Sequence, residues 1–136
     1  MLTCLLRTAL RYLVLLQCCS AGVVRSIILS STACAGTLLL EFATLSRLSG
    51  NGEYERVAKR ALVALWSRRS EMGLVGGHID IVTGQWTHKD SGVGTSIDSY
   101  FEYLMKAHLM TGEHEYLVIF QQAYGAAKAY LSRQPW

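Results

Sequence analysis

Apolar residues recur at the spacing of an amphipathic α-helix in four stretches of the chain. In the clearest stretch, residues 53–69, apolar side chains recur every third or fourth position with charged side chains between them. Breaks that contain glycine separate neighbouring stretches, at Gly50-Asn51-Gly52 and at Gly112. The pattern therefore predicts helices over about residues 35–48, 53–69, 96–110 and 113–131.

Between the second and third predicted helices, the pattern becomes typical of a β-hairpin. Ile79-Asp80-Ile81 alternates apolar and polar side chains, and Thr83-Gly84 supplies a two-residue turn within the segment 74–88. The order helix, helix, hairpin, helix, helix predicts an all-α fold. Two helical hairpins joined by a short β-hairpin are typical of part of a toroid rather than of a compact bundle, and such a unit leaves one side open for neighbouring pairs.

Composition and charge argue against two classes of protein. Hydrophobic residues make up 51% of the 136 positions, which is too many for a disordered chain. The net charge of +3 comes from residues 1–34, which hold three arginines and no acidic residue, whereas residues 35–136 hold 10 basic and 10 acidic side chains. Because the body of the chain is neutral and shows no basic patch, no nucleic-acid partner is expected.

Residues 1–33 have the composition of a targeting segment. A short basic start precedes the apolar run Tyr12–Cys19 and the small residues Ser20-Ala21-Gly22. This order is typical of a secretory signal peptide, and as an anchor the same segment would associate the protein with a membrane. The alternative is an unmatched N-terminal segment 1–33 followed by the body of the chain at 34–136. The four cysteines lie within the first quarter and lack the spacing of metal ligands.

Glu41 occupies an unusual position on the first predicted helix. On a helical wheel it lies between Leu38, Leu45 and Leu48, inside the apolar stripe. A carboxylate in that position costs several kcal/mol unless it is paired or hydrogen-bonded, so the position suggests a functional site. The alternative is that Glu41 lies at the edge of the stripe and reaches solvent.

Asp98 and Glu102 form an acidic pair one helical turn apart on the third predicted helix. They lie on one face and flank an apolar stripe that includes Ile97 and Phe101. Acids beside aromatic rings suit sugar binding, because carboxylates accept hydrogen bonds from hydroxyls, and paired carboxylates also carry out glycoside hydrolysis. The alternative is that Asp98 caps the helix and Glu102 is only solvated.

The hairpin contains three residues of metal-binding type, His78, Asp80 and His88. In a regular hairpin that turns at Thr83-Gly84, His78 and Asp80 point to one face and His88 to the other. The three side chains are therefore not expected to converge on one zinc ion.

Several stretches of the body resemble class I α-1,2-mannosidases, glycoside hydrolase family 47. The matching stretches are Gly36-Thr37-Leu38-Leu39-Leu40-Glu41-Phe42, Leu45-Ser46-Arg47-Leu48, Gly73-Leu74-Val75-Gly76, Lys89-Asp90-Ser91-Gly92-Val93-Gly94 and Ile97-Asp98-Ser99-Tyr100-Phe101-Glu102-Tyr103-Leu104. Within the family, the chain is more similar to the ER degradation-enhancing α-mannosidase-like branch than to the processing mannosidases. Ser96 supports this choice, because it stands where processing enzymes carry a sugar-contacting arginine.

The resemblance implies a partial (α/α)7 barrel, to which this chain would contribute about two helical pairs, with a central glycan site and a bound calcium ion. It implies inversion at the anomeric carbon by separated acids and a water molecule. Asp98 matches a catalytic acid, whereas Glu102 and Glu41 match acids that line the sugar subsite. The family's general acid and its calcium-binding threonine have no counterpart in this chain, so no metal ligand is assigned and the isolated chain is expected to be inactive.

The expected protein is a fragment of an α-1,2-mannosidase-like protein of the endoplasmic reticulum, in the lumen or associated with the membrane. It would trim high-mannose N-glycans on misfolded glycoproteins during quality control and ER-associated degradation. Two alternatives stay open. One is a protein that binds glycans or misfolded glycoproteins without hydrolysis, and the other is a helical interaction domain behind a membrane anchor.

Overall fold

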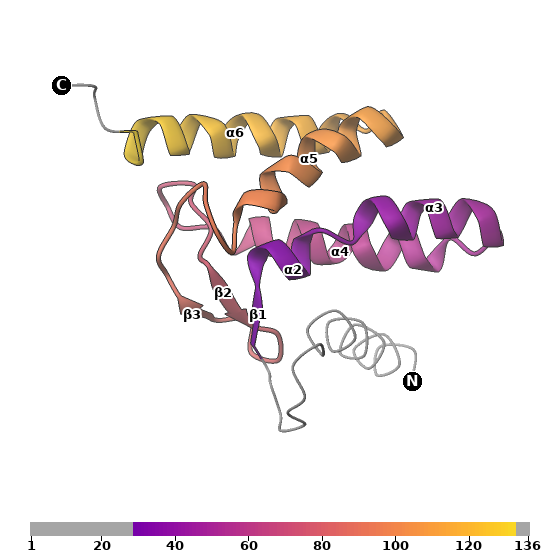
Figure 1. The fold of residues 1–136 in the computed structure, drawn as a ribbon, viewed down its shortest axis with the longest axis horizontal. Coiled ribbons are helices and arrows are strands. Elements are labelled where there is room, and N and C mark those ends of the chain that lie inside the picture. Colours follow the sequence, from indigo (N-terminus) through magenta and orange to yellow (C-terminus); the bar gives the residue numbers. More distant parts are fainter. Residues whose placement is uncertain (1–28, 133–136) are drawn as a thin grey trace.

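The computed structural model describes residues 29–132, which form paired helices beside a small sheet (Figure 1). In chain order the elements are β1 (Leu29–Ser31), α2 (Thr32–Gly36), α3 (Leu39–Ser49), α4 (Glu53–Ser67), β2 (His78–Asp80), β3 (Trp86–His88), α5 (Asp98–Thr111) and α6 (His114–Tyr130). The predicted helical fold with two helical hairpins and a short β-hairpin is confirmed. The predicted signal peptide or anchor lies outside the described residues, and no helix within residues 29–132 is long and apolar enough to cross a membrane.

The two helical hairpins are α3–α4 and α5–α6. The first helix of each pair ends at a glycine with a positive φ, 71° at Gly50 and 76° at Gly112. Glycine adopts this left-handed conformation without the steric cost of a Cβ, so each helix can end there and the chain can reverse. Lys59 on α4 joins the two hairpins through ion pairs with Glu113 and Glu115 near the start of α6.

The first predicted helix is divided in the structure, which corrects its predicted start. Thr37 departs from helical geometry, with φ −114° and ψ 47°, so α2 and α3 are separate helices. This break allows α2 to contact both α4 and α5, while α3 runs along α4. Gly36, the last residue of α2, lies so close to α5 that a Cβ there would overlap the ring of Tyr100.

The sheet has three antiparallel strands in the order β1-β2-β3, one more than predicted. β1 pairs Leu29 with Asp80 and Ser31 with His78. The buried Thr32 extends this connection, because its N–H donates to Gly77 O at 3.0 Å and its hydroxyl donates to Gly76 O at 2.6 Å. Three residues are too few to show an alternating pattern, which is why β1 was not predicted.

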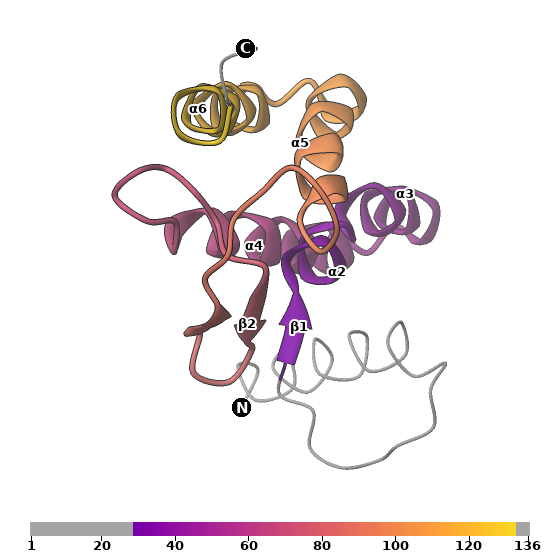
Figure 2. The ribbon, with the colours of Figure 1, turned by 60° about the vertical axis from the view of Figure 1, so that its left-hand side comes forward.

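The core lies where α2, α3, α4, α5 and α6 meet, with the sheet on the far side of α2 and α4 from α5 and α6 (Figure 2). Tyr100 is fully buried there, and its hydroxyl donates to Leu62 O at 3.1 Å. The largest fully buried side chains are Tyr100, Tyr116, Leu39, Leu62, Leu104 and Thr32. These contacts fix the axis of α5 and therefore the positions of the acids that it carries.

Candidate functional site

The loop before α5 holds the first turn of this helix in place. The N–H groups of Ile97 and Asp98 both donate to Gly94 O, at 3.1 Å and 2.9 Å. Ile97 is buried, and Ser96 O accepts a hydrogen bond of 2.8 Å from the N–H of Ala33. Ser96 has a φ of 78°, which is the left-handed region that non-glycine residues adopt only at a cost. The start of α5 is thus fixed by burial, by turn hydrogen bonds and by one strained residue.

Asp98 is the first residue of α5, and its carboxylate is exposed to solvent. Its Oδ1 accepts a hydrogen bond of 2.9 Å from the N–H of Ser99. Ile97 occupies the N-cap position, so Asp98 is not the capping residue, although its charge lies at the favourable positive end of the helix dipole. The capping alternative is therefore wrong for Asp98 as the N-cap residue, whereas a favourable interaction with the helix dipole is consistent with its place in the first turn.

Glu102 lies one turn after Asp98 and is also exposed. Its Oε1 accepts a hydrogen bond of 2.6 Å from Lys106 Nζ, and more than half of each side chain is exposed. An exposed pair of this kind contributes little to stability. Lys106 does, however, offset the repulsion between the two acids of α5 and orients the Glu102 carboxylate.

The structure corrects the predicted burial of Glu41. The buried residues of α3 are Leu39, Ala43 and Ser46, whereas Glu41 is exposed together with Leu45 and Leu48. α3 packs on α4 and α5, and its buried positions are 39, 43 and 46. Of the three leucines that flank Glu41 in the predicted stripe, Leu38 is buried whereas Leu45 and Leu48 are exposed, so the core covers only one end of that stripe. The alternative placement, in which Glu41 reaches solvent, is the correct one.

Glu41 nevertheless has a specific partner on α5. The Tyr103 hydroxyl donates to Glu41 Oε1 at 2.5 Å, a length typical of a bond to an ionised carboxylate. This bond, together with partial burial and the charges of Glu41 and Glu102, raises the pKa of Tyr103 to about 12. The structure therefore brings Glu41 and Glu102 into the electrostatic neighbourhood of one phenol. Sequence reasoning missed Tyr103, although its place directly after Glu102 could have drawn attention to it.

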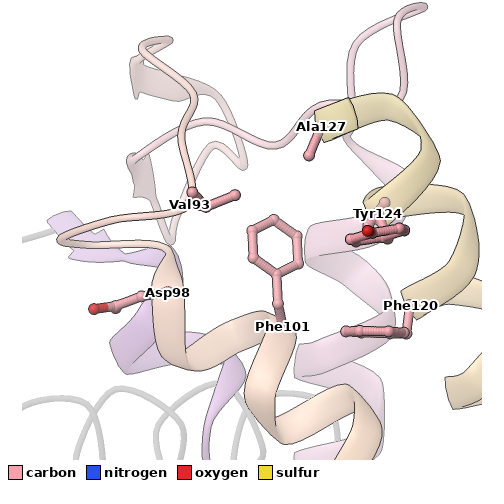
Figure 3. Close-up of a pocket in the computed structure, with 7 residues that line it drawn as sticks. Val93, Asp98, Phe101, Phe120, Tyr124 and Ala127 are labelled. Carbon is pink, nitrogen blue, oxygen red and sulfur yellow. The ribbon is translucent and has the colours of Figure 1, made fainter. Parts of the chain in front are cut away.

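A small apolar cavity of about 180 Å³ lies between α5 and α6, next to Asp98. It is lined by Val93, Asp98, Phe101, Phe120, Ala123, Tyr124 and Ala127. Figure 3 shows the Phe101 ring between Val93 on one side and Phe120 and Tyr124 on the other, whereas the Asp98 carboxylate points away from these rings. The Asp98 carboxylate and the aromatic rings therefore face different directions, unlike the predicted arrangement in which the acids lie beside the rings. The cavity is also smaller than the roughly 300 Å³ at which ligand pockets usually begin.

The hairpin histidines are not arranged as predicted. His78 pairs directly with His88 across β2 and β3, and their ring centroids lie 4.8 Å apart. A register shift between His78 and Ile79 brings the two rings together, so the prediction that they lie on opposite faces is wrong. Asp80 has a local role instead, because its Oδ1 accepts hydrogen bonds from the N–H groups of Val82 and Thr83, which lower its pKa.

The described residues do not build a metal centre. Within residues 29–132, no group of three or more His, Cys, Asp or Glu side chains is placed to hold a metal ion. Two carboxylates of the site accept hydrogen bonds from different side chains, Glu41 from Tyr103 and Glu102 from Lys106. These residues therefore do not fit a calcium ion by themselves.

Comparison with known proteins identifies relatives of the chain. Residues 19–136 match Glycosyl hydrolase family 47, and the match includes part of the segment 1–33. The chain is 56% identical over 108 residues to "Alpha-mannosidase I MNS4" of Arabidopsis thaliana, which covers 79% of this chain and 17% of the relative. It is 50% identical over 105 residues to "ER degradation-enhancing alpha-mannosidase-like protein 3" of Homo sapiens, covering 76% and 11%.

A more distant relative is "Mannosyl-oligosaccharide 1,2-alpha-mannosidase" of Candida albicans, 33% identical over 104 residues, covering 75% of this chain and 18% of the relative. The higher identity to the ER degradation-enhancing proteins confirms the predicted branch. The chain spans less than a fifth of the length of these relatives. The match over most of the chain and the order of its motifs establish that this protein belongs to glycosyl hydrolase family 47.

Proposed function

We propose that the full-length gene product is an α-1,2-mannosidase-like glycosidase that trims high-mannose N-glycans on misfolded glycoproteins in the endoplasmic reticulum. The observation that carries this proposal is the acidic face of α5, where Asp98 and Glu102 are exposed one turn apart and Tyr103 connects to Glu41. Carboxylates in solvent-exposed positions can accept hydrogen bonds from sugar hydroxyls. The names of the relatives support both the chemistry and the compartment.

In the proposed reaction, Asp98 activates or positions the attacking water. Its free carboxylate oxygen would accept a proton from a water that attacks the anomeric carbon, with inversion of configuration. Glu41 and Glu102 would accept hydrogen bonds from hydroxyls of the same mannose residue. The leaving oxygen needs a proton from a general acid that this chain does not supply. The calcium ion implied by the resemblance would be held by residues outside this chain.

The role of Asp98 can be tested in the full-length gene product by measuring mannose release from a high-mannose glycan. Asp98→Asn should lower turnover by about 10²- to 10⁴-fold, the usual contribution of a general acid or base. Glu71→Gln, a substitution of an exposed acid outside α5, serves as the control and should leave turnover unchanged. Equal turnover for Asp98→Asn and the unsubstituted protein would refute the catalytic role.

The isolated 136-residue chain should release no mannose, because the general acid that the resemblance implies has no counterpart in it. Measurable release by the purified chain, abolished by Asp98→Asn, would contradict this expectation.

The second candidate function is glycan binding without hydrolysis, which the serine at position 96 favours. Retained glycan binding in Asp98→Asn, with no turnover by the full-length protein, would support that alternative.

A further inference from the structure

Tyr103 is the side chain that connects the acidic face of α5 to α3. Among residues 29–132, it is the hydrogen-bond partner of the Glu41 carboxylate, with 2.5 Å between the phenol oxygen and Oε1. The two residues are 62 positions apart in the chain. The bond therefore depends on how α3 and α5 pack, and both helices are held by the core around Tyr100 and Leu39.

A hydrogen bond from a phenol changes what an exposed glutamate can do. A glutamate in solvent samples many rotamers, and fixing it when a ligand binds reduces affinity. The Tyr103 hydroxyl fixes one carboxylate oxygen of Glu41 before any ligand arrives. The other oxygen keeps its lone pairs, so it can accept a hydrogen bond from a second hydroxyl.

The surrounding charges make a neutral donor suitable at this position. Glu102 precedes Tyr103 on α5 and is paired with Lys106, so the cation of this region is already engaged by another acid. A phenol holds the Glu41 carboxylate without cancelling its charge. The two candidate subsite acids are thus oriented by different partners, Glu41 by a neutral hydroxyl and Glu102 by an ammonium group.

We propose that Tyr103 is a positioning residue, whose hydroxyl pre-orients the Glu41 carboxylate to accept a hydrogen bond from a mannose hydroxyl. The inference rests on the proposed function, because it assigns a role within the same glycan site. It predicts that the Tyr103 hydroxyl contributes to glycan affinity through Glu41, and that it contributes little to the chemical step.

The test uses the full-length gene product with Tyr103→Phe, which keeps the ring and removes the hydroxyl. KM for a high-mannose glycan, or Kd where there is no turnover, should rise about tenfold, which corresponds to the loss of one good hydrogen bond, while kcat changes less than about twofold. Tyr130→Phe, at the last residue of α6, is the matched control and should leave both constants unchanged. Circular dichroism and thermal unfolding of each variant show whether the fold is retained.

A double-mutant comparison shows whether the effect passes through Glu41. In a Glu41→Gln background, Tyr103→Phe should have little further effect on KM or Kd. An undiminished effect in that background would overturn the inference, as would a Tyr103→Phe protein that behaves like Tyr130→Phe. If the unsubstituted protein neither turns over nor binds the glycan, the proposed function fails and this inference fails with it.

Discussion

Gly36 provides the most direct test of how α5 is held. Replacing it with alanine adds one methyl group at the end of α2, where it would overlap the Tyr100 ring and approach Leu65 Cδ1 to 3.1 Å. Because both Gly36 and Tyr100 are buried, the ring cannot move into solvent to make room. Either α2 or α5 must shift, and a shift of α5 would move Asp98 and Glu102.

Two opposing contributions set the change in the free energy of unfolding that Gly36→Ala should cause. Alanine in place of glycine reduces the entropy of the unfolded chain and favours folding by about 0.5–1 kcal/mol. Overpacking in a well-packed core costs about 1–3 kcal/mol. The steric cost should dominate, so Gly36→Ala should lower the free energy of unfolding by about 1–2 kcal/mol. With a urea m-value of about 1–2 kcal/mol/M, the midpoint should fall by roughly 1 M.

The assay is urea denaturation of the purified chain, followed by the fluorescence of tryptophans such as the buried Trp66. Gly125→Ala is the matched control, because Gly125 is also helical but exposed. Apart from its chain neighbours and the backbone of its own helix, nothing lies within 4 Å of the position that its new methyl group would take. That variant should be stabilised by up to about 1 kcal/mol through helix propensity. A Gly36→Ala chain that is stabilised as much as Gly125→Ala would refute the steric explanation.

Two further predictions concern the site itself. Ser96→Gly should stabilise the chain by about 0.5–1 kcal/mol in the same urea assay, because glycine adopts a φ of 78° without strain. Ser96→Val should destabilise it by about 1–2 kcal/mol. Equal stabilities of the two variants would contradict the strain at this position. The pKa of Tyr103 is raised to about 12, above an ordinary value of about 10, so its contribution to stability should be complete below about pH 10 and lost as the pH rises toward 12. Absorbance titration of tyrosinate, compared with Tyr103→Phe, measures this pKa, and Glu41→Gln should lower it; a pKa near 10 in the unsubstituted chain would show that the bond to Glu41 does not form.

The sequence predicts the helices well because the periodic apolar positions and the glycines that end helices are local features of the chain. The second predicted helix, 53–69, corresponds to α4 at Glu53–Ser67, and the end of α5 follows from Gly112. The short strand β1 depends on a distant partner, β2, and Gly36, directly before the division at Thr37, packs against the distant ring of Tyr100. A single sequence contains no periodic signal for such contacts, so these features could not be predicted from it.

The acids of the candidate site could be identified from the sequence, but their surroundings could not. A helical wheel places Glu41 in an apolar stripe without showing which stripe meets α4, and the structure uses the stripe of Leu39 and Ala43 instead. The bond from Tyr103 to Glu41 spans two helices, and the register shift at His78 depends on the partner strand. These features arise from tertiary packing, which overrides local pattern.

The order of the strands has a consequence for synthesis of the chain. Leu29 in β1 pairs with Asp80 in β2, so the first strand needs a partner that is made much later. At a synthesis rate of about 5–20 residues per second, the delay is roughly 3–10 s. The α3–α4 hairpin, whose contacts are local, can form within that time, whereas β1 must wait with an unpaired edge. We therefore expect β1 to be the segment of the described chain that depends most on protection from aggregation before folding is complete.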